Sequence, residues 1–116
     1  MRFMTFVKSA ETSEPPPQAL MEAMEKLVEE SVKNGTMVYS GGLSPAASAT
    51  RVRIGNGRVS ITDGPFSEAK EVVGGFAILE LPSKEAAVEA VKRFIELHRE
   101  HWPGWEGESE IRQIFE

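Results

Sequence analysis

Four charged side chains gather around a Gly-Pro-Phe in the stretch TDGPFSEAKE, residues 62–71: Asp63, Glu68, Lys70 and Glu71. A carboxylate that leaves an apolar face lies partly buried or at the rim of a pocket, and burial raises its pKa toward the range of a general acid or base. We therefore expect Asp63 to be the catalytic acid–base group. Lys70 and Glu71 would form a charged lip beside it, with Lys70 holding an anionic substrate.

A structural role is the alternative for each of these residues. Asp63 could bond the backbone amides of the turn made by Gly64-Pro65, as an Asx turn does. Glu68, Lys70 and Glu71 could be exposed surface ion pairs, which contribute little to stability. The two interpretations of Asp63 are compatible, because the Gly-Pro corner would hold the aspartate in one place in either case.

Three further residues are candidates for ligand binding. Arg51 belongs with Arg53 and Arg58 to a basic stripe that could bind a carboxylate or phosphate, or could be the solvent face of a hairpin paired with acids of a partner subunit. Tyr39 could present its hydroxyl to a pocket or pack in the core with one hydrogen bond. We expect Phe66 to be buried, as part of the core or as the wall of a pocket.

Composition limits the classes of function. The chain of 116 residues fits one domain, residues 1–116, and its net charge of −5 argues against nucleic-acid binding. The absence of cysteine excludes thiolate catalysis and disulfides, and the two histidines, His98 and His101, are too few for a transition-metal site. We expect no cofactor and no metal. No apolar run is long enough to span a membrane, so we expect a cytoplasmic protein.

Hydrophobic periodicity predicts an α+β protein. The expected order is strand 2–8, helix 18–33 ended by Asn34-Gly35, strand 36–40, a hairpin within 50–62, strand 74–81, helix 84–101 capped by Ser83, and strand 109–115. Removal of the hairpin leaves βαββαβ, the ferredoxin-like arrangement with an antiparallel sheet.

The hairpin register follows from its turn. Asn56-Gly57 suits the positive backbone angles of a two-residue turn. Ile54 then faces Val59, and the apolar side chains of both strands share one face. Asp63 leaves the hairpin on this apolar side.

Two helices can cover only one face of the predicted sheet. The strands at 2–8 and 74–81 carry apolar residues on both alternating sets. An apolar face open to water is unfavourable, and a second copy packed face to face would cover it. We therefore expect a homodimer.

The string Asp63-Gly64-Pro65-Phe66, followed by Glu68, Lys70-Glu71 and Gly74-Gly75-Phe76, resembles the signature of the DGPF family of YCII-related proteins. The resemblance continues in Gly41-Gly42-Leu43, Pro45, the run 49–53 and the MRFM start. It implies a dimeric α+β barrel built on a ferredoxin-like protomer, found in bacteria.

The resemblance suggests a kind of site but supplies no reaction. YCII-related proteins have been suggested to act through a His–Asp pair in a cleft, and this sequence has no His before residue 98. The expected function is binding of a small molecule in a cleft, with acid–base chemistry through Asp63. The alternative is a non-catalytic dimeric binding or regulatory module associated with a sigma factor system.

Overall fold

The computed structural model describes residues 1–12 and 14–116. Its helices and strands are β1 (Arg2–Ser9), α1 (Gln18–Lys33), β2 (Met37–Gly42), the short 3₁₀ helix η1 (Ala46–Ser48), β3 (Thr50–Gly55), β4 (Arg58–Asp63), β5 (Val72–Glu80), α2 (Lys84–His101) and β6 (Gly107–Gln113).

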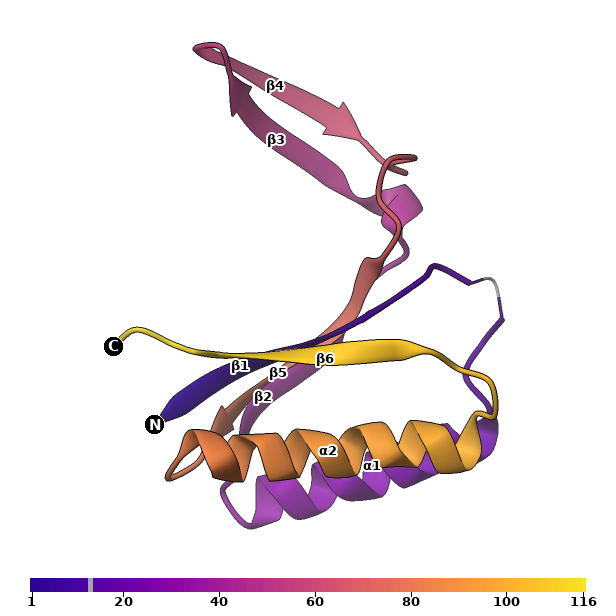
Figure 1. Ribbon diagram of the computed structural model, residues 1–116, viewed down its shortest axis with the longest axis vertical. Helices are drawn as coiled ribbons and strands as arrows, with labels where there is room; N and C mark the ends of the chain where they lie inside the picture. The colour runs from indigo at the N-terminus through magenta and orange to yellow at the C-terminus, as the bar shows by residue number, and fades with distance from the viewer. Residues whose placement is uncertain (13) are drawn as a thin grey trace.

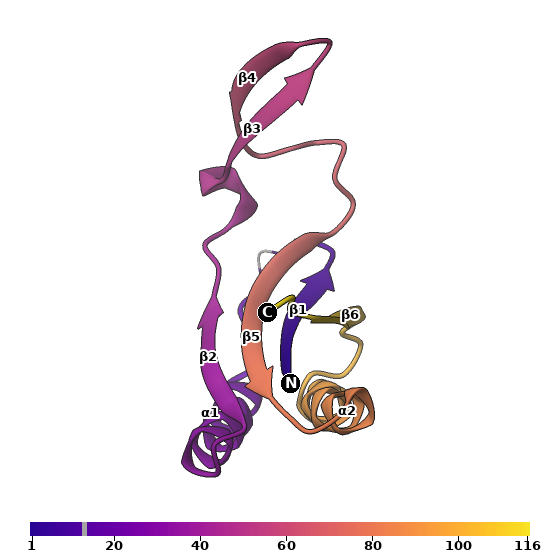
Figure 2. The ribbon, with the colours of Figure 1, turned by 90° about the vertical axis from the view of Figure 1, so that its left-hand side faces the viewer.

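Four of the strands form one antiparallel sheet in the order β2-β5-β1-β6, and β3 pairs with β4 in a separate two-stranded sheet. Both helices lie on one face of the four-stranded sheet (Figures 1 and 2). The predicted α+β, ferredoxin-like arrangement with an inserted hairpin is confirmed. Several strand boundaries differ by one or two residues; for example, β5 begins at Val72 and β6 at Gly107, each two residues earlier than expected.

Local sequence signals define the ends of the elements. Ser83 Oγ accepts a hydrogen bond of 3.1 Å from the Ala86 amide and caps α2. Gly35 follows α1 with a φ of 81°, a conformation that glycine adopts without strain. Asn56 and Gly57 have φ angles of 52° and 74°, as the two-residue hairpin turn requires.

The core lies between the sheet and the two helices. Its buried apolar side chains are Phe3, Leu20, Leu79, Ala87 and Val91. Phe3 of β1 lies opposite Leu79 of β5, so both side chains point to the helices. Burial of a Phe or Leu side chain contributes about 1.5–3 kcal/mol, which makes this layer the main source of stability.

The other face of the four-stranded sheet carries no helix, and we call it the helix-free face. Its apolar side chains come from three adjacent strands: Met4 and Phe6 of β1, Phe76 and Ile78 of β5, and Tyr39 of β2. The prediction that β1 and β5 are apolar on both faces is confirmed.

The hairpin β3–β4, residues 50–63, stands away from the rest of the protein, and we call it the arm. It projects on the side of the sheet opposite the helices (Figures 1 and 2). The radius of gyration is 15.9 Å, whereas a compact domain of this length has about 13 Å. The arm accounts for this extended shape.

Neither α1 nor α2 combines the length and the apolar content of a membrane-crossing helix. Within residues 1–12 and 14–116, no three acidic or histidine side chains converge in a way that would hold a metal ion.

Candidate functional site

Asp63 lies at the base of the arm, at the end of β4. It pairs with Thr50, whose Oγ1 donates a hydrogen bond of 3.0 Å to Asp63 Oδ1. The predicted register is right, because Asp63 shares a face with Ile61 and Val59. That face is itself open to water, with Ile61 72% exposed, and Asp63 is exposed in the single chain. Of its two predicted positions, partial burial is wrong here, and the rim of a pocket stays a prediction. Thr50 also takes the place of the backbone amides that an Asx turn would use.

Gly64 joins the arm to the segment that precedes it. Its amide donates a hydrogen bond of 2.7 Å to the Ala49 carbonyl, and the Gly64–Pro65 peptide bond is cis. A Cβ at residue 64 would lie 2.3 Å from the Ala46 carbonyl oxygen, closer than such atoms approach in proteins. The close contact between η1 and Gly64 therefore requires glycine, and we call this contact the elbow.

Arg51 lies on the opposite face of β3 from Thr50. Its guanidinium is 3.8 Å from the centre of the Phe66 ring, and its Nη1 donates to Glu68 Oε1. This hydrogen bond holds the pKa of the Glu68 carboxyl below its usual value. Arg51 is thus engaged by residues of its own chain, and it points away from the face that carries Asp63.

The Arg51–Phe66–Glu68 cluster was not predicted as a unit. Phe66 is half-buried beneath the guanidinium, consistent with the expected wall position, and Glu68 is the exposed partner in an ion pair, as its structural interpretation proposed. One signal in the sequence could have indicated this cluster. The hairpin register places Arg51 opposite Thr62, and Thr62 is only a few residues before the turn at 66–69.

Lys70 and Glu71 are exposed and lie between that turn and β5. Within the described part of the chain, no hydrogen bond or ion pair joins either of them to Asp63. Glu71 instead lines an open depression of about 410 Å³ together with Ala10, Glu106, Gly107 and Glu108. This acidic recess is not the charged lip that the sequence predicted.

Tyr39 lies on the helix-free face with 62% of its surface exposed. Its ring centre is 5.7 Å from that of Phe76, and Phe76 in turn covers Gly41, where a Cβ would meet the ring at 3.2 Å. The core interpretation of Tyr39 is wrong because the register of β2 shifts between Met37 and Tyr39. Such an irregularity moves the following side chains to the other face of the sheet.

Charged residues border the helix-free face along β6. Lys8 Nζ lies 2.9 Å from Glu110 Oε1 and 3.9 Å from Glu108 Oε1, and Arg112 Nε lies 3.9 Å from Glu110 Oε2. The Lys8–Glu110 hydrogen bond raises the pKa of Lys8 and lowers the pKa of Glu110. The face is therefore apolar and aromatic over three strands and charged along the fourth.

His98 is buried near the C-terminal end of α2. Its Nδ1 lies 3.1 Å from the Phe94 carbonyl oxygen, and its ring centre is 4.8 Å from that of Phe94 and 4.5 Å from that of Trp105. Burial lowers the pKa of His98. His98 is therefore a packed residue near a helix end.

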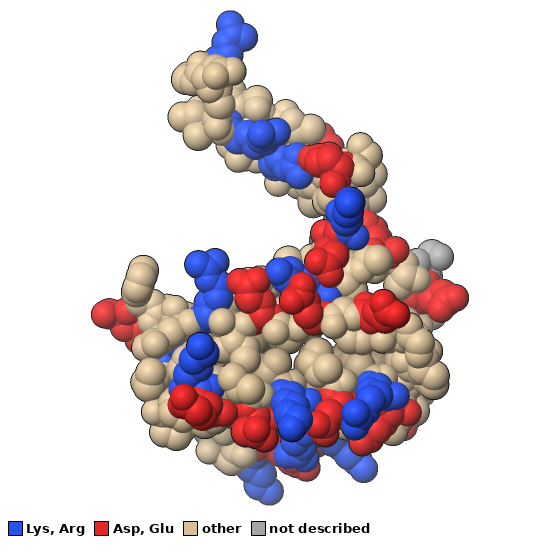
Figure 3. All heavy atoms as spheres, viewed as in Figure 1, with Lys and Arg blue, Asp and Glu red and all other residues tan. Residues whose placement is uncertain are grey.

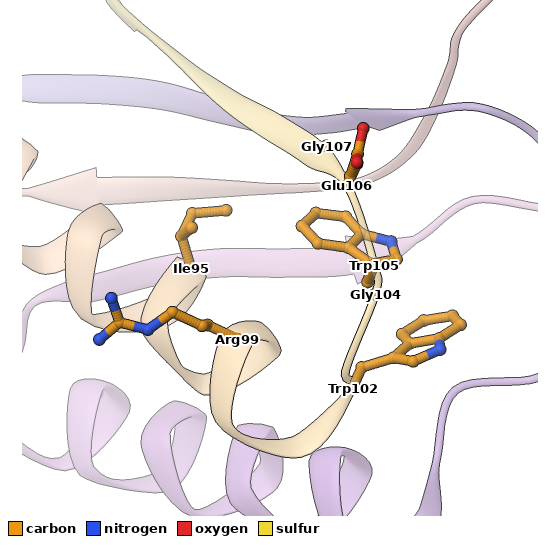
Figure 4. A pocket seen from close by; sticks show the side chains of 7 residues that line it. All are labelled: Ile95, Arg99, Trp102, Gly104, Trp105, Glu106 and Gly107. Carbon is orange, nitrogen blue, oxygen red and sulfur yellow. The ribbon is translucent and has the colours of Figure 1, made fainter.

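Trp102 and Trp105 flank the turn that follows α2. Figure 4 shows Trp105 between α2 and the start of β6. Trp105 lines an open depression with a volume of about 370 Å³. Residues lining this depression include Ile95, Arg99, Trp102, Trp105 and Glu106. It lies at the helix end and contains none of the candidate residues of the arm or the helix-free face.

The geometry thus defines an α+β protein with a two-layer body, an apolar and aromatic sheet face that carries no helix, and an extended arm. A family model of the YCII-related domain matches residues 1–96, and the chain belongs to this family. No curated protein matches the sequence. The matched region contains the arm and also β1, β2 and β5, the strands that supply the apolar side chains of the helix-free face.

Proposed function

We propose that the protein is a homodimer in which the two helix-free faces pack together and hold a small organic molecule between them. The observation that carries this proposal is the aromatic surface made by Tyr39, which is 62% exposed, and the half-buried Phe76, on the face of the sheet that carries no helix. Met4, Phe6 and Ile78 extend this surface over adjacent strands.

Two physical arguments support the dimer and the ligand class. A contiguous apolar face on a soluble protein marks an interaction surface, and two such faces packed together remove it from water. Tyr39 offers a ring that stacks on planar compounds and a hydroxyl that bonds to them. The expected ligands are therefore small phenols and other planar aromatic compounds.

Acid–base catalysis by Asp63 is the second candidate function. Its carboxylate is accessible, and Thr50 Oγ1 occupies one of its oxygens, Oδ1. The second oxygen has no side-chain partner among the described residues. A general base must first be accessible to the substrate and correctly oriented, and the Asp63 carboxylate meets these two geometric requirements.

A thermal-shift screen of small phenols and other planar aromatic compounds tests the binding proposal. A ligand specific for the folded protein raises the melting temperature with concentration. Tyr39→Ala should reduce this shift without unfolding the protein, because the side chain is mostly exposed. Met21→Ala is the matched control, since Met21 is 49% exposed on α1, away from the helix-free face. An equal loss of the shift in both variants would contradict the proposed surface.

Asp63→Asn separates binding from catalysis. The variant keeps the shape of the side chain and its acceptor oxygen but removes the titratable group. If the protein only binds, ligand-induced shifts are the same in Asp63→Asn and the natural protein, and neither converts the ligand. Turnover of a screened compound that disappears in Asp63→Asn would establish the catalytic role instead.

A further inference from the structure

The arm presents an apolar stripe that its own chain leaves uncovered. The stripe consists of Val52, Ile54, Val59 and Ile61, which are 67%, 76%, 69% and 72% exposed. Val52 pairs with Ile61 and Ile54 with Val59 across the two strands, so all four side chains lie on one face of the ribbon. They form one continuous surface rather than scattered exposed residues.

A stripe of this kind requires a covering surface. A two-stranded hairpin is marginally stable in water unless one face packs against something. The two faces of the arm differ in polarity. The face opposite the stripe is polar, with Arg51, Arg53, Arg58, Ser60 and Thr62. The alternation of the arm is that of a sheet with one buried face.

Charge identifies the kind of surface that fits. The arm carries three arginines and one aspartate, a net charge of +2, whereas the whole chain carries −5, so the rest of the chain has −7. Carboxylates gather near the start of β6, where Glu71, Glu106 and Glu108 line one depression. A two-stranded ribbon is only one layer thick. A molecule packed on one face of the arm therefore lies within the Debye length, about 8 Å, of the arginines on the other face and feels their positive charge.

The shape of the protein points to the same occupant. Figure 3 shows a hollow between the arm and the body, on the helix-free side of the sheet. A molecule that covers the stripe must offer an apolar surface, and negative charge on it would complement the arginines of the arm. A second copy of this chain offers both, and in a two-fold pair each arm would meet the same surface of the other copy.

We propose that the arm clasps the second copy in the dimer, with the apolar stripe packed on the partner. This inference rests on the dimer of the proposed function and adds a second contact to it. Thr50 and Asp63 share the face of the stripe, so the clasp also places the Asp63 carboxylate against the partner. The site around Asp63 is then composite, and one chain alone leaves it incomplete.

Sedimentation velocity over a dilution series tests the clasp. The variant Ile54→Thr/Val59→Thr removes apolar surface and keeps β-branched side chains that favour a strand. It should raise the dimer dissociation constant by about tenfold or more. The matched control Ser60→Asn/Thr62→Asn changes two residues on the opposite face of the same ribbon and should leave the constant unchanged.

The outcomes separate the clasp from the dimer itself. If the natural protein is a dimer and the stripe variant dissociates no more readily than the control, the clasp is overturned and the dimer stands. If the natural protein is monomeric throughout the dilution series, both the clasp and the dimer of the proposed function are overturned. If a ligand still raises the melting temperature of a monomeric protein, the proposed binding surface stands although the clasp and the dimer are overturned.

A chemical probe gives a direct readout of the covered face. The natural sequence has no cysteine, so a single introduced thiol reacts alone. Ile54→Cys should be alkylated more slowly at concentrations that favour the dimer than after dilution, whereas Ser60→Cys should react at the same rate in both. Equal rates at the two concentrations for Ile54→Cys in a dimeric sample would overturn the clasp.

Discussion

In the body and in the arm, successive side chains of each strand point to opposite faces, but the two regions expose these faces differently. In β1 and β5 the alternation places Phe3 and Leu79 under the helices, where they are 1% and 5% exposed. In the arm it places Ile54 and Ile61 in water, 76% and 72% exposed. Alternation determines which side chains share a face, and a covering layer must come from elsewhere in the chain or from another molecule.

The largest expected contrast between the two regions is in stability. Phe3→Ala should lower the free energy of unfolding by about 3–5 kcal/mol, because it opens a cavity in the core. Ile54→Thr should change it by less than about 0.5 kcal/mol in a monomeric sample, since the side chain contacts mostly water. Urea denaturation measured at high dilution checks both values. Similar costs for the two variants would contradict the division into body and arm.

The elbow is where the two regions meet, and Gly64→Ala tests it. The added Cβ would lie 2.3 Å from the Ala46 carbonyl oxygen, so the contact must open at a cost of about 1–3 kcal/mol. Gly74→Ala is the control, because no atom lies within 4 Å of its Cβ position. Hydrogen exchange of residues 50–63 should accelerate in Gly64→Ala alone. Unchanged exchange would show that the elbow does not hold the arm.

A dependence of stability on pH should arise in the body, from His98. Burial lowers its folded-state pKa below the ordinary value of 6.5, so the unfolded chain takes up the proton first as the pH falls. The stabilising contribution is complete above about 6.5 and is lost below it, at no more than about 1.4 kcal/mol per pH unit. Denaturation at several pH values should show this slope in the natural protein and in His101→Gln. A slope retained in His98→Leu would assign it to another group.

The smallest expected effect lies at the base of the arm. Loss of the Arg51 guanidinium removes the hydrogen bond that lowers the pKa of Glu68, so this pKa should rise toward its ordinary value of 4.5 in Arg51→Met. Arg58→Met, on the same face near the arm tip, should leave it unchanged. Titration of the Glu68 carboxyl carbon by NMR measures both. Identical titration curves in the natural protein and Arg51→Met would show that the pair does not persist in solution.

The sequence predicted the parts of the fold that depend on local signals. The Asn56-Gly57 turn determined the hairpin register, and the order of elements determined the four-strand sheet. Ser83 and Gly35 marked helix ends through capping chemistry that acts within a few residues. Each of these features follows from contacts between near neighbours or from a pattern with a fixed period.

The candidate site was harder to predict, because its contacts join residues that no helical or strand periodicity relates. Asp63 was assigned to the right face, yet its exposure depends on what covers the arm. Tyr39 was predicted either at a pocket or in the core, and the shift in β2 after Met37 placed it on the helix-free face. The pairing of Arg51 with Glu68 depends on the path of the chain after the elbow. The alternation of apolar and polar residues in the strands does not predict that path.

The elbow also makes the arm a mechanical lever. Each strand of the arm has six residues, which at about 3.3 Å per residue gives a lever of roughly 20 Å. A rotation of about 10° at Gly64 would displace the tip by roughly 3.5 Å over that length. Small rearrangements at one glycine, where η1 and the end of β4 touch, are thereby magnified at Asn56-Gly57. The reach of the arm is thus governed by a contact at its pivot.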